Sequence, residues 1–139
     1  GQAALFEYDQ RLQPQIFADT MHFIPHADGT LAVGSTSERT YENPTTTDAN
    51  LDDIIDKAVN ILPDLKNSKV IARWAGVRPR SKSRAPVLGI HPMVASEYIA
   101  NGGFKIGFWM APKIAQVMAN LILEDRDDIP NDFRVEKSL

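Results

Sequence analysis

Residues 20–35 read TMHFIPHADGTLAVGS and decide the first part of the fold. Two β-prone segments, 20–26 and 30–35, flank the link Ala27-Asp28-Gly29. Asp-Gly between such segments predicts a β-hairpin, because glycine supplies the positive φ that the turn needs. Pro25 has no N–H to donate, so its strand is expected at a sheet edge or bulged at that point.

A polar loop at 37–47 follows this hairpin, and a helix is expected directly after the loop. Thr47 or Asp48 can cap its first N–H groups, and Pro63 ends it. Apolar residues recur between them at helical spacing and form one stripe: Leu51, Ile54, Ile55, Ala58, Val59 and Leu62. The charged residues turn outward: Asp52, Asp53, Asp56 and Lys57.

The rest of the chain adds short strands and a second helix. Segments 3–6, 69–74, 86–89 and 97–100 have strand character. A helix is expected to start at Ala111-Pro112, because a proline at the first helical position loses no hydrogen bond. Its predicted apolar face is Ile114, Val117, Met118, Leu121 and Ile122. We therefore predict an α+β fold with mostly antiparallel strands and two main helices, in a single domain over residues 1–139.

Composition excludes several classes of protein. The formal net charge of −3 over 139 residues is too near neutral for a generic nucleic-acid or membrane-surface protein. Without cysteine, disulfides and thiolate chemistry are excluded. No signal peptide is evident, and the apolar stretch 109–123 is too short to span a bilayer, so we expect no membrane contact and a cytoplasmic location. The chain starts without Met and reads as if it begins inside a longer sequence.

Basic residues are concentrated in one stretch. Residues 65–96 contain no acidic side chain and hold seven of the fifteen basic ones: Lys66, Lys69, Arg73, Arg78, Arg80, Lys82 and Arg84. Such a field favours an anion, although a solvated basic face would give the same pattern. Arg78 is the best candidate, because it lies between Val77 and Pro79 in a constrained segment, and its planar guanidinium suits a carboxylate or phosphate.

A glycine-rich segment, residues 101–107, precedes the second predicted helix. Glycines let the backbone approach a ligand, and a helix N-terminus offers free N–H groups, although such a turn can also be a simple connection. Neither GxGxxG nor a Walker pattern occurs in the chain. His22 and His26 lie on a predicted strand around Pro25, which disfavours a metal site. No residue pattern indicates acid–base or nucleophilic catalysis.

Several motifs stand in the order and spacing of one protein family. They are residues 22–25 (HFIP), 28–36 (DGTLAVGST), 74–79 (WAGVRP), 86–89 (PVLG), 102–107 (GGFKIG) and 111–112 (AP). With these motifs, almost the whole chain resembles the C-terminal part of an FAD-dependent D-amino-acid oxidase family protein, nearest to the glycine oxidase branch. The W-A-G-x-R-P and G-x-F-x-x-G elements are specific in combination, whereas either alone is not.

The resemblance implies a fragment of a longer enzyme. Family members have a GxGxxG nucleotide-binding half and a substrate half built on a mixed, largely antiparallel sheet, and this chain contains only the latter. The family reaction is hydride transfer from the substrate α-carbon to flavin, giving an imine. We therefore expect the whole protein to bind FAD and oxidise a small amine that carries a carboxylate. The fragment alone should be inactive and hold FAD weakly or not at all.

The resemblance also assigns site residues. Arg78 matches the arginine that grips the substrate carboxylate, and residues 103–108 match the segment against the flavin ring: Gly103, Phe104, Lys105, Ile106, Gly107 and Phe108. Phe23 stands where glycine oxidases have a substrate-lining Tyr, and Ser37 stands where they have a Met. Lys105, expected to contact the substrate as well as the flavin, replaces an Arg, and Gly103 replaces a His. These departures argue against glycine as the substrate but keep the flavin-dependent amine oxidation.

Two alternatives remain open from the sequence. A stand-alone anion- or RNA-binding module would explain the basic stretch, but only Trp74 interleaves with its cations for base stacking. It would not explain the glycine-rich segment at family spacing. A purely structural or interaction domain would also fit the chain alone. The oxidoreductase interpretation expects the missing nucleotide-binding half as a partner, allows a homo-oligomer and predicts no nucleic-acid binding.

Overall fold

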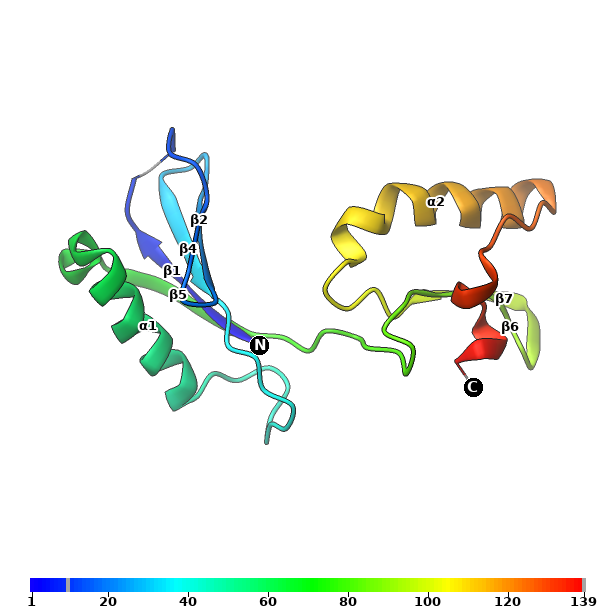
Figure 1. Cartoon of the computed structure of the whole chain (residues 1–139), viewed down its shortest axis with the longest axis horizontal. Helices are drawn as coiled ribbons and strands as arrows, with labels where there is room; N and C mark the ends of the chain where they lie inside the picture. Colours follow the sequence, from blue (N-terminus) through cyan, green and yellow to red (C-terminus); the bar gives the residue numbers. More distant parts are fainter. Residues whose placement is uncertain (10, 139) are drawn as a thin grey trace. The chain divides into compact units, whose positions relative to one another are not determined.

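The chain is described by a computed structural model that covers residues 1–9 and 11–138. It divides into two compact units, Gly1–Val77 and Arg78–Leu139. Each unit has its own sheet and one long helix, and each is described by itself (Figure 1).

The first unit is built on a five-stranded sheet. In spatial order β2-β3-β4-β1-β5, its strands are β2 (Ile16–Ala18), β3 (Met21–Pro25), β4 (Thr30–Gly34), β1 (Gln2–Glu7) and β5 (Val70–Ala75). Every neighbouring pair is antiparallel. Strand β5 therefore pairs with the start of the chain, although more than sixty residues separate it from β1 along the sequence.

The predicted hairpin is confirmed and consists of β3 and β4. Gly29 has a φ of 83°, and the amide of His26 donates to the carbonyl of Thr30 at 2.9 Å. The Thr30 amide donates to the Asp28 carboxylate at 3.0 Å and orders the turn. Strand β2, which the sequence pattern missed, pairs with β3 only as far as Phe23. Pro25 therefore has a partner strand on one side only, as a residue without an N–H requires.

The first helix is also confirmed. Helix α1 (Ala49–Ile61) begins after Asp48, whose carboxylate accepts a hydrogen bond from the Asn50 amide at 2.9 Å. It stops before Pro63, where the short 3₁₀ helix η1 (Pro63–Asn67) starts. Of its apolar stripe, Leu51 and Ala58 are fully buried.

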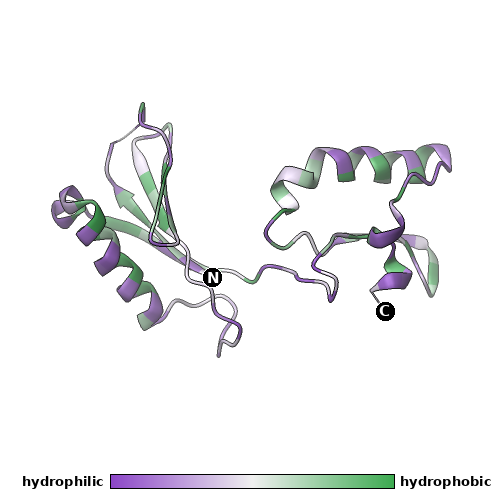
Figure 2. Ribbon diagram, viewed as in Figure 1, coloured by the Kyte–Doolittle hydropathy of each residue, from purple (hydrophilic) through white to green (hydrophobic). Residues whose placement is uncertain are grey.

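Helix α1 covers one face of the sheet and forms the core of the first unit (Figure 1). The buried side chains are Ala4, Phe6, Met21, Phe23, Leu31, Val33, Leu51, Ala58 and Leu65. Figure 2 shows apolar residues recurring along α1 and along the strands it covers. Asp52 of α1 is exposed, as expected, and it also forms an ion pair with Arg73 of β5.

The second unit combines a hairpin with a helix. Strands β6 (Val87–His91) and β7 (Val94–Asn101) pair antiparallel, and helix α2 (Gly107–Glu124) follows. The tail forms two 3₁₀ turns, η2 (Asn131–Phe133) and η3 (Val135–Lys137), and Arg134 makes a parallel bridge to Leu88. Antiparallel sheets and two main helices confirm the predicted α+β class. Among the described residues, no helix combines the length and apolar character needed to cross a membrane.

The predicted start of the second helix is wrong by four residues. Helix α2 begins at Gly107, so Pro112 lies inside it. The first helical bond runs from the Met110 amide to the Ile106 carbonyl at 3.0 Å, before the proline is reached. Pro112 has no N–H to offer the carbonyl of Phe108, four residues earlier, so one intrahelical hydrogen bond is missing just after the first turn.

The buried face of α2 is largely the predicted one. Val117, Met118 and Leu121 pack with Leu88 and Ile129, and Ile114 is half-buried against them. Ile122 was expected on this face but is 46% exposed. Because a helix turns by about 100° per residue, Ile122 lies at the margin of the stripe formed by Val117, Met118 and Leu121.

Candidate functional site

The two motifs that the sequence singles out meet in the second unit. The Phe104 amide donates to the Pro79 carbonyl at 3.1 Å, and Arg80 forms an antiparallel bridge with Gly103. Residues 79–80 and 103–104 thus lie side by side although more than twenty residues separate them along the chain. This short backbone pairing connects the arginine-containing segment with the glycine-rich one.

Glycine is required at two positions of the glycine-rich segment. A Cβ atom on Gly103 would lie 2.6 Å from the Cα of Gly107, closer than real Cβ contacts come. Gly102 has a φ of 76° and is buried, and its missing side chain leaves room for Val87 and the Ala85 carbonyl. The Ile106 amide then closes a turn by donating to the Gly103 carbonyl at 2.9 Å. The segment is therefore a tight turn that leads directly into α2.

Two cations flank the ring of Phe104. The guanidinium carbon of Arg80 lies 5.7 Å from the ring centroid, and the Lys105 ammonium lies 5.8 Å from it. Both distances fall within the range of a cation–π interaction. Phe104 itself is half-buried and has a φ of 44°, a left-handed conformation that is unusual for a bulky residue. The turn thus holds an aromatic ring within reach of two positive charges.

An open groove of about 390 Å³ runs beside this turn. Its wall includes Pro79, Gly103, Phe104, Gly107 and Ala111. The lining consists mainly of apolar atoms from glycine, alanine and proline residues, with one aromatic ring. Three residues of the predicted flavin segment, Gly103, Phe104 and Gly107, therefore border one hollow together with the residue that follows Arg78.

The N-terminus of α2 opens next to the same turn. The N-cap residue, Ile106, makes no side-chain cap hydrogen bond. Since the first helical bond begins at the Met110 amide, the amides of Gly107, Phe108 and Trp109 belong to the uncapped first turn. Free amides and the helix dipole favour negative charge here. The helix end that can face an anion is thus at Gly107, and not at Pro112 as the sequence predicted.

The remaining predicted residues of this unit are accessible. Arg78, Lys105 and Ile106 are exposed, and Phe108 is 88% exposed. Arg78 is the first residue of the second unit. It directly precedes Pro79, whose carbonyl accepts the Phe104 amide, so Arg78 lies one residue from the backbone pairing. The structure thereby brings six predicted cofactor residues and the predicted clamp into one unit.

The other two predicted substrate residues lie in the first unit. Phe23 is 1% exposed and packs in the core under α1, so its side chain presents no surface to a ligand in this structure. Ser37 is exposed in the loop after β4. Along β3, alternation turns His22 and Ile24 to the opposite face from Phe23.

His22, considered from the sequence only as a disfavoured metal ligand, is the polar side chain of β3 on that outer face. It is exposed, its Nδ1 lies 2.7 Å from the Gln15 side-chain nitrogen, and its ring lies 4.6 Å from that of Phe17. The period-two pattern of Met21 and Phe23 against His22 and Ile24 is the signal that separates the two faces.

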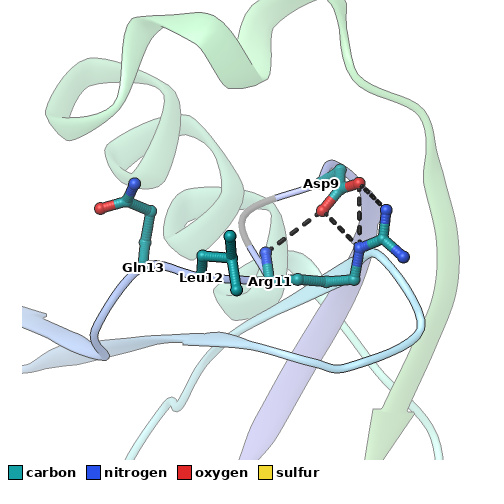
Figure 3. A pocket seen from close by; sticks show the side chains of 4 residues that line it. All are labelled: Asp9, Arg11, Leu12 and Gln13. Atoms are coloured by element: carbon teal, nitrogen blue, oxygen red, sulfur yellow. Dashed lines mark hydrogen bonds and ion pairs between the residues drawn. The ribbon is translucent and has the colours of Figure 1, made fainter.

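Two further hollows in the first unit involve local ion pairs and caps. A cavity of about 480 Å³ is lined by Asp9, Arg11, Leu12 and Gln13, and the Asp9 carboxylate faces the Arg11 guanidinium at 2.7 Å there (Figure 3). Hydrogen bonds from the side chain and backbone of Arg11 lower the pKa of Asp9. Both side chains are more than half exposed, at 55% and 53%, so this pair orders a loop and offers no special chemistry.

The second hollow, of about 610 Å³, surrounds a network centred on Gln2. The Gln2 side-chain amide donates to Glu38 and Asp48, both at 2.8 Å, and accepts from the Asp48 backbone amide. Hydrogen bonds from Gln2 and from the Asn50 amide lower the pKa of Asp48. Burial raises the pKa of Glu38, but hydrogen bonds from Thr36, its own backbone and Gln2 outweigh it and leave that pKa lowered.

Comparisons with known proteins agree with these features. The profile of the FAD dependent oxidoreductase family, DAO, matches residues 1–121. Glycine oxidase of Bacillus subtilis is 30% identical over 131 residues, covering 93% of this chain and 36% of that protein. Glycine oxidase of Pseudomonas putida is 34% identical over 124 residues, covering 88% of this chain and 34% of that protein. The chain thus spans about a third of the length of these relatives.

Solved structures show the same fold. A glycine oxidase from Bacillus cereus superposes with a TM-score of 0.79 at 28% identity and covers 92% of this chain and 36% of its own. An iminodiacetate oxidase from Chelativorans shares only 18% identity but superposes with a TM-score of 0.79, which supports the fold alone. The family profile covers most of the chain, so the chain belongs to the FAD-dependent oxidoreductase family.

Proposed function

We propose that this chain is the part of a longer FAD-dependent oxidoreductase that contacts the substrate and the flavin. The whole enzyme oxidises an amino acid or a secondary amine that carries a carboxylate. The observation that supports this most is the backbone pairing of residues 79–80 with residues 103–104, because it joins the arginine motif to the glycine-rich motif.

The residues of the second unit fit a flavin. Gly103 has no space for a side chain, Gly107 leaves the backbone open, and a groove of about 390 Å³ runs past both. The uncapped amides at the start of α2 suit the negative charge that a reduced flavin ring carries. When bound, the flavin supplies the hydride acceptor. Residues 103–108 would then hold the ring, and Lys105 would add positive charge beside it.

Arg78 is proposed to bind and orient the substrate carboxylate. An arginine fork offers two parallel donors to a carboxylate, which fixes the direction of the α-carbon. Its neighbour Pro79 is tied by the Phe104 amide, so the backbone of the clamp is anchored to the flavin segment. Substrate-lining roles for Phe23 and Ser37 stay predictions, and the burial of Phe23 gives its role no support.

The rest of the enzyme is proposed to supply the nucleotide-binding half. The chain spans about a third of its relatives, and no GxGxxG occurs within it. Helix α2 leaves Phe108, Trp109 and Leu123 more than 80% exposed, at 88%, 84% and 81%. A helix that is apolar on most sides is normally buried, so we propose that the missing half covers this surface. A cytoplasmic location is part of the same proposal.

Removing the proposed carboxylate clamp, Arg78, tests this function. In the longer protein, Arg78→Ala should raise the KM of an amino acid on the order of thirtyfold or more, because a buried ion pair loses one partner. The KM of the matching amine without a carboxylate should change little. Lys82→Ala is the matched control, since Lys82 is an exposed cation of the same segment. If both substrates lose affinity equally, or neither does, Arg78 is not the clamp.

The RNA-binding alternative predicts a different outcome. It draws on the acid-free basic stretch at residues 65–96, and it requires no flavin. If the longer protein bound single-stranded RNA with a steep salt dependence and purified without flavin, the oxidoreductase proposal would fail.

A further inference from the structure

We infer that Arg80 is a positioning residue that holds the flavin-contacting turn, residues 103–108, in place. This inference rests on the function proposed above. Neither its sequence motif nor the family resemblance assigned Arg80 a role. The inference concerns how the turn is held, and it does not make Arg80 a ligand of the flavin or of the substrate.

The backbone of Arg80 already lies against the turn. Arg80 bridges Gly103, and the preceding residue accepts the Phe104 amide at 3.1 Å. This pairing is short, and it is followed on one side by the exposed loop residues Lys82 and Arg84. A two-residue ladder without neighbours is weak by itself, because isolated strand pairs are marginal in water. A side-chain contact between the two segments therefore adds needed stability to this short backbone pairing.

The Arg80 side chain provides that contact. Its guanidinium carbon lies 5.7 Å from the centre of the Phe104 ring. Arginine stacks on aromatic faces better than a compact ammonium does, and the interaction contributes most where the ring is partly desolvated. Phe104 is half-buried and borders the groove beside Gly103 and Gly107. Arg80 thus restrains the side chain of Phe104, which borders this groove.

The turn has little tolerance for movement. Phe104 adopts a φ of 44°, and Gly103 approaches Gly107 closely enough to exclude a Cβ. A left-handed backbone at a bulky residue persists only where surrounding contacts hold it. Lys105, the other cation near the ring, belongs to the turn itself and cannot anchor it to another segment. Arg80, in contrast, reaches the ring from a different segment.

The first experiment measures amide hydrogen exchange in the 139-residue chain. Arg80→Ala keeps the backbone bridge and removes the ring contact, so exchange at the Phe104 and Ile106 amides should become about two- to fivefold faster. Arg80→Lys keeps a cation but stacks less well on the ring, so its exchange should lie between wild type and Arg80→Ala. Lys82→Ala is the control and should leave both amides unchanged. Equal exchange in Arg80→Ala and Lys82→Ala would overturn the inference.

A second experiment links the turn to the flavin in the longer protein. Titration with FAD should show affinity two- to fivefold weaker for Arg80→Ala, with Arg80→Lys between that variant and wild type. The ratio of KM for an amino acid to KM for the amine without a carboxylate should stay constant, because Arg78 is intact. If the unsubstituted protein binds no FAD, the proposed function fails. If it binds FAD and Arg80→Ala binds it equally well, only the inference about Arg80 fails.

Discussion

At the scale of single residues, the two faces of strand β3 separate a core position from an exposed one. Phe23 fills the core of the first unit, whereas His22 lies one residue away on the outer face. Phe23→Ala should therefore lower the free energy of unfolding by about 3–5 kcal/mol, since it opens a cavity among well-packed neighbours. His22→Ala should change it by less than about 1 kcal/mol, as is usual for exposed positions. Urea denaturation of both variants measures this difference.

The same pair of variants decides what β3 can offer a ligand. The resemblance placed a substrate contact at Phe23, and burial of that side chain is a reason to examine its neighbour. A small loss of stability in Phe23→Ala would contradict the core assignment and reopen the substrate role. A large loss would show that any effect of Phe23 on catalysis has to be separated from unfolding.

At the scale of elements, the predictable parts were those set by local chemistry. The Asp28-Gly29 turn, the Asp48 cap and the stop at Pro63 each specify a boundary through nearby atoms, and each is found. Strand β2 has only three residues and depends on pairing with β3, which no local pattern reveals. The start of α2 depends on the turn closed between Gly103 and Ile106, and Pro112 gave a misleading signal.

In the candidate site, too, the features set by local chemistry were predictable and the pairing of distant segments was not. The sequence marked Arg78 and the glycine-rich segment, because their residue types suit an anion and a close backbone approach. It could not show that residues 79–80 pair with 103–104, since that pairing joins segments far apart along the chain. Arg80 was accordingly one cation among seven until its distance to the Phe104 ring distinguished it.

The Gln2 network predicts how acid affects the first unit. Gln2 links β1 to the cap of α1 through Asp48, and to the loop after β4 through Glu38. The pKa values of both carboxyl groups are lowered. A lowered pKa in the folded state stabilises the protein above the unfolded-state pKa, and this stabilisation is lost as the pH falls through the folded-state value. The urea midpoint should therefore decline between about pH 5 and pH 3.

Gln2→Met tests this origin, because methionine has a similar length and donates no hydrogen bond. Its urea midpoint should be lower near neutral pH, and it should vary less than wild type between about pH 5 and pH 3. A variant with Thr45→Ala, in the exposed loop nearby, is the control for loop effects. An unchanged slope in Gln2→Met would assign the acid sensitivity to other carboxyl groups.

At the scale of the whole molecule, the exposed apolar residues of α2 support the proposal that this chain is one part of a larger enzyme. The chain spans about a third of its glycine oxidase relatives, and Phe108 and Trp109 form an exposed edge-to-face pair with centroids 6.4 Å apart. An aromatic pair on the surface next to an uncapped helix start is expected to meet another part of the protein. Tryptophan fluorescence can observe that meeting directly.

The chain has two tryptophans, of which Trp109 is 84% exposed and Trp74 is 43% exposed. With Trp74→Phe, Trp109 becomes the only emitter, and in the 139-residue chain acrylamide should quench it readily. When the same substitution is made in the longer protein, with any tryptophan outside these 139 residues also replaced by Phe, emission should move to shorter wavelength and quenching should fall severalfold, because the missing half removes the indole from water. Trp109→Phe reports the first unit alone and serves as the control. Equal quenching of Trp109 in both proteins would mean that the nucleotide-binding half covers some other surface, and the proposed burial of α2 would then be wrong even if the enzyme binds FAD.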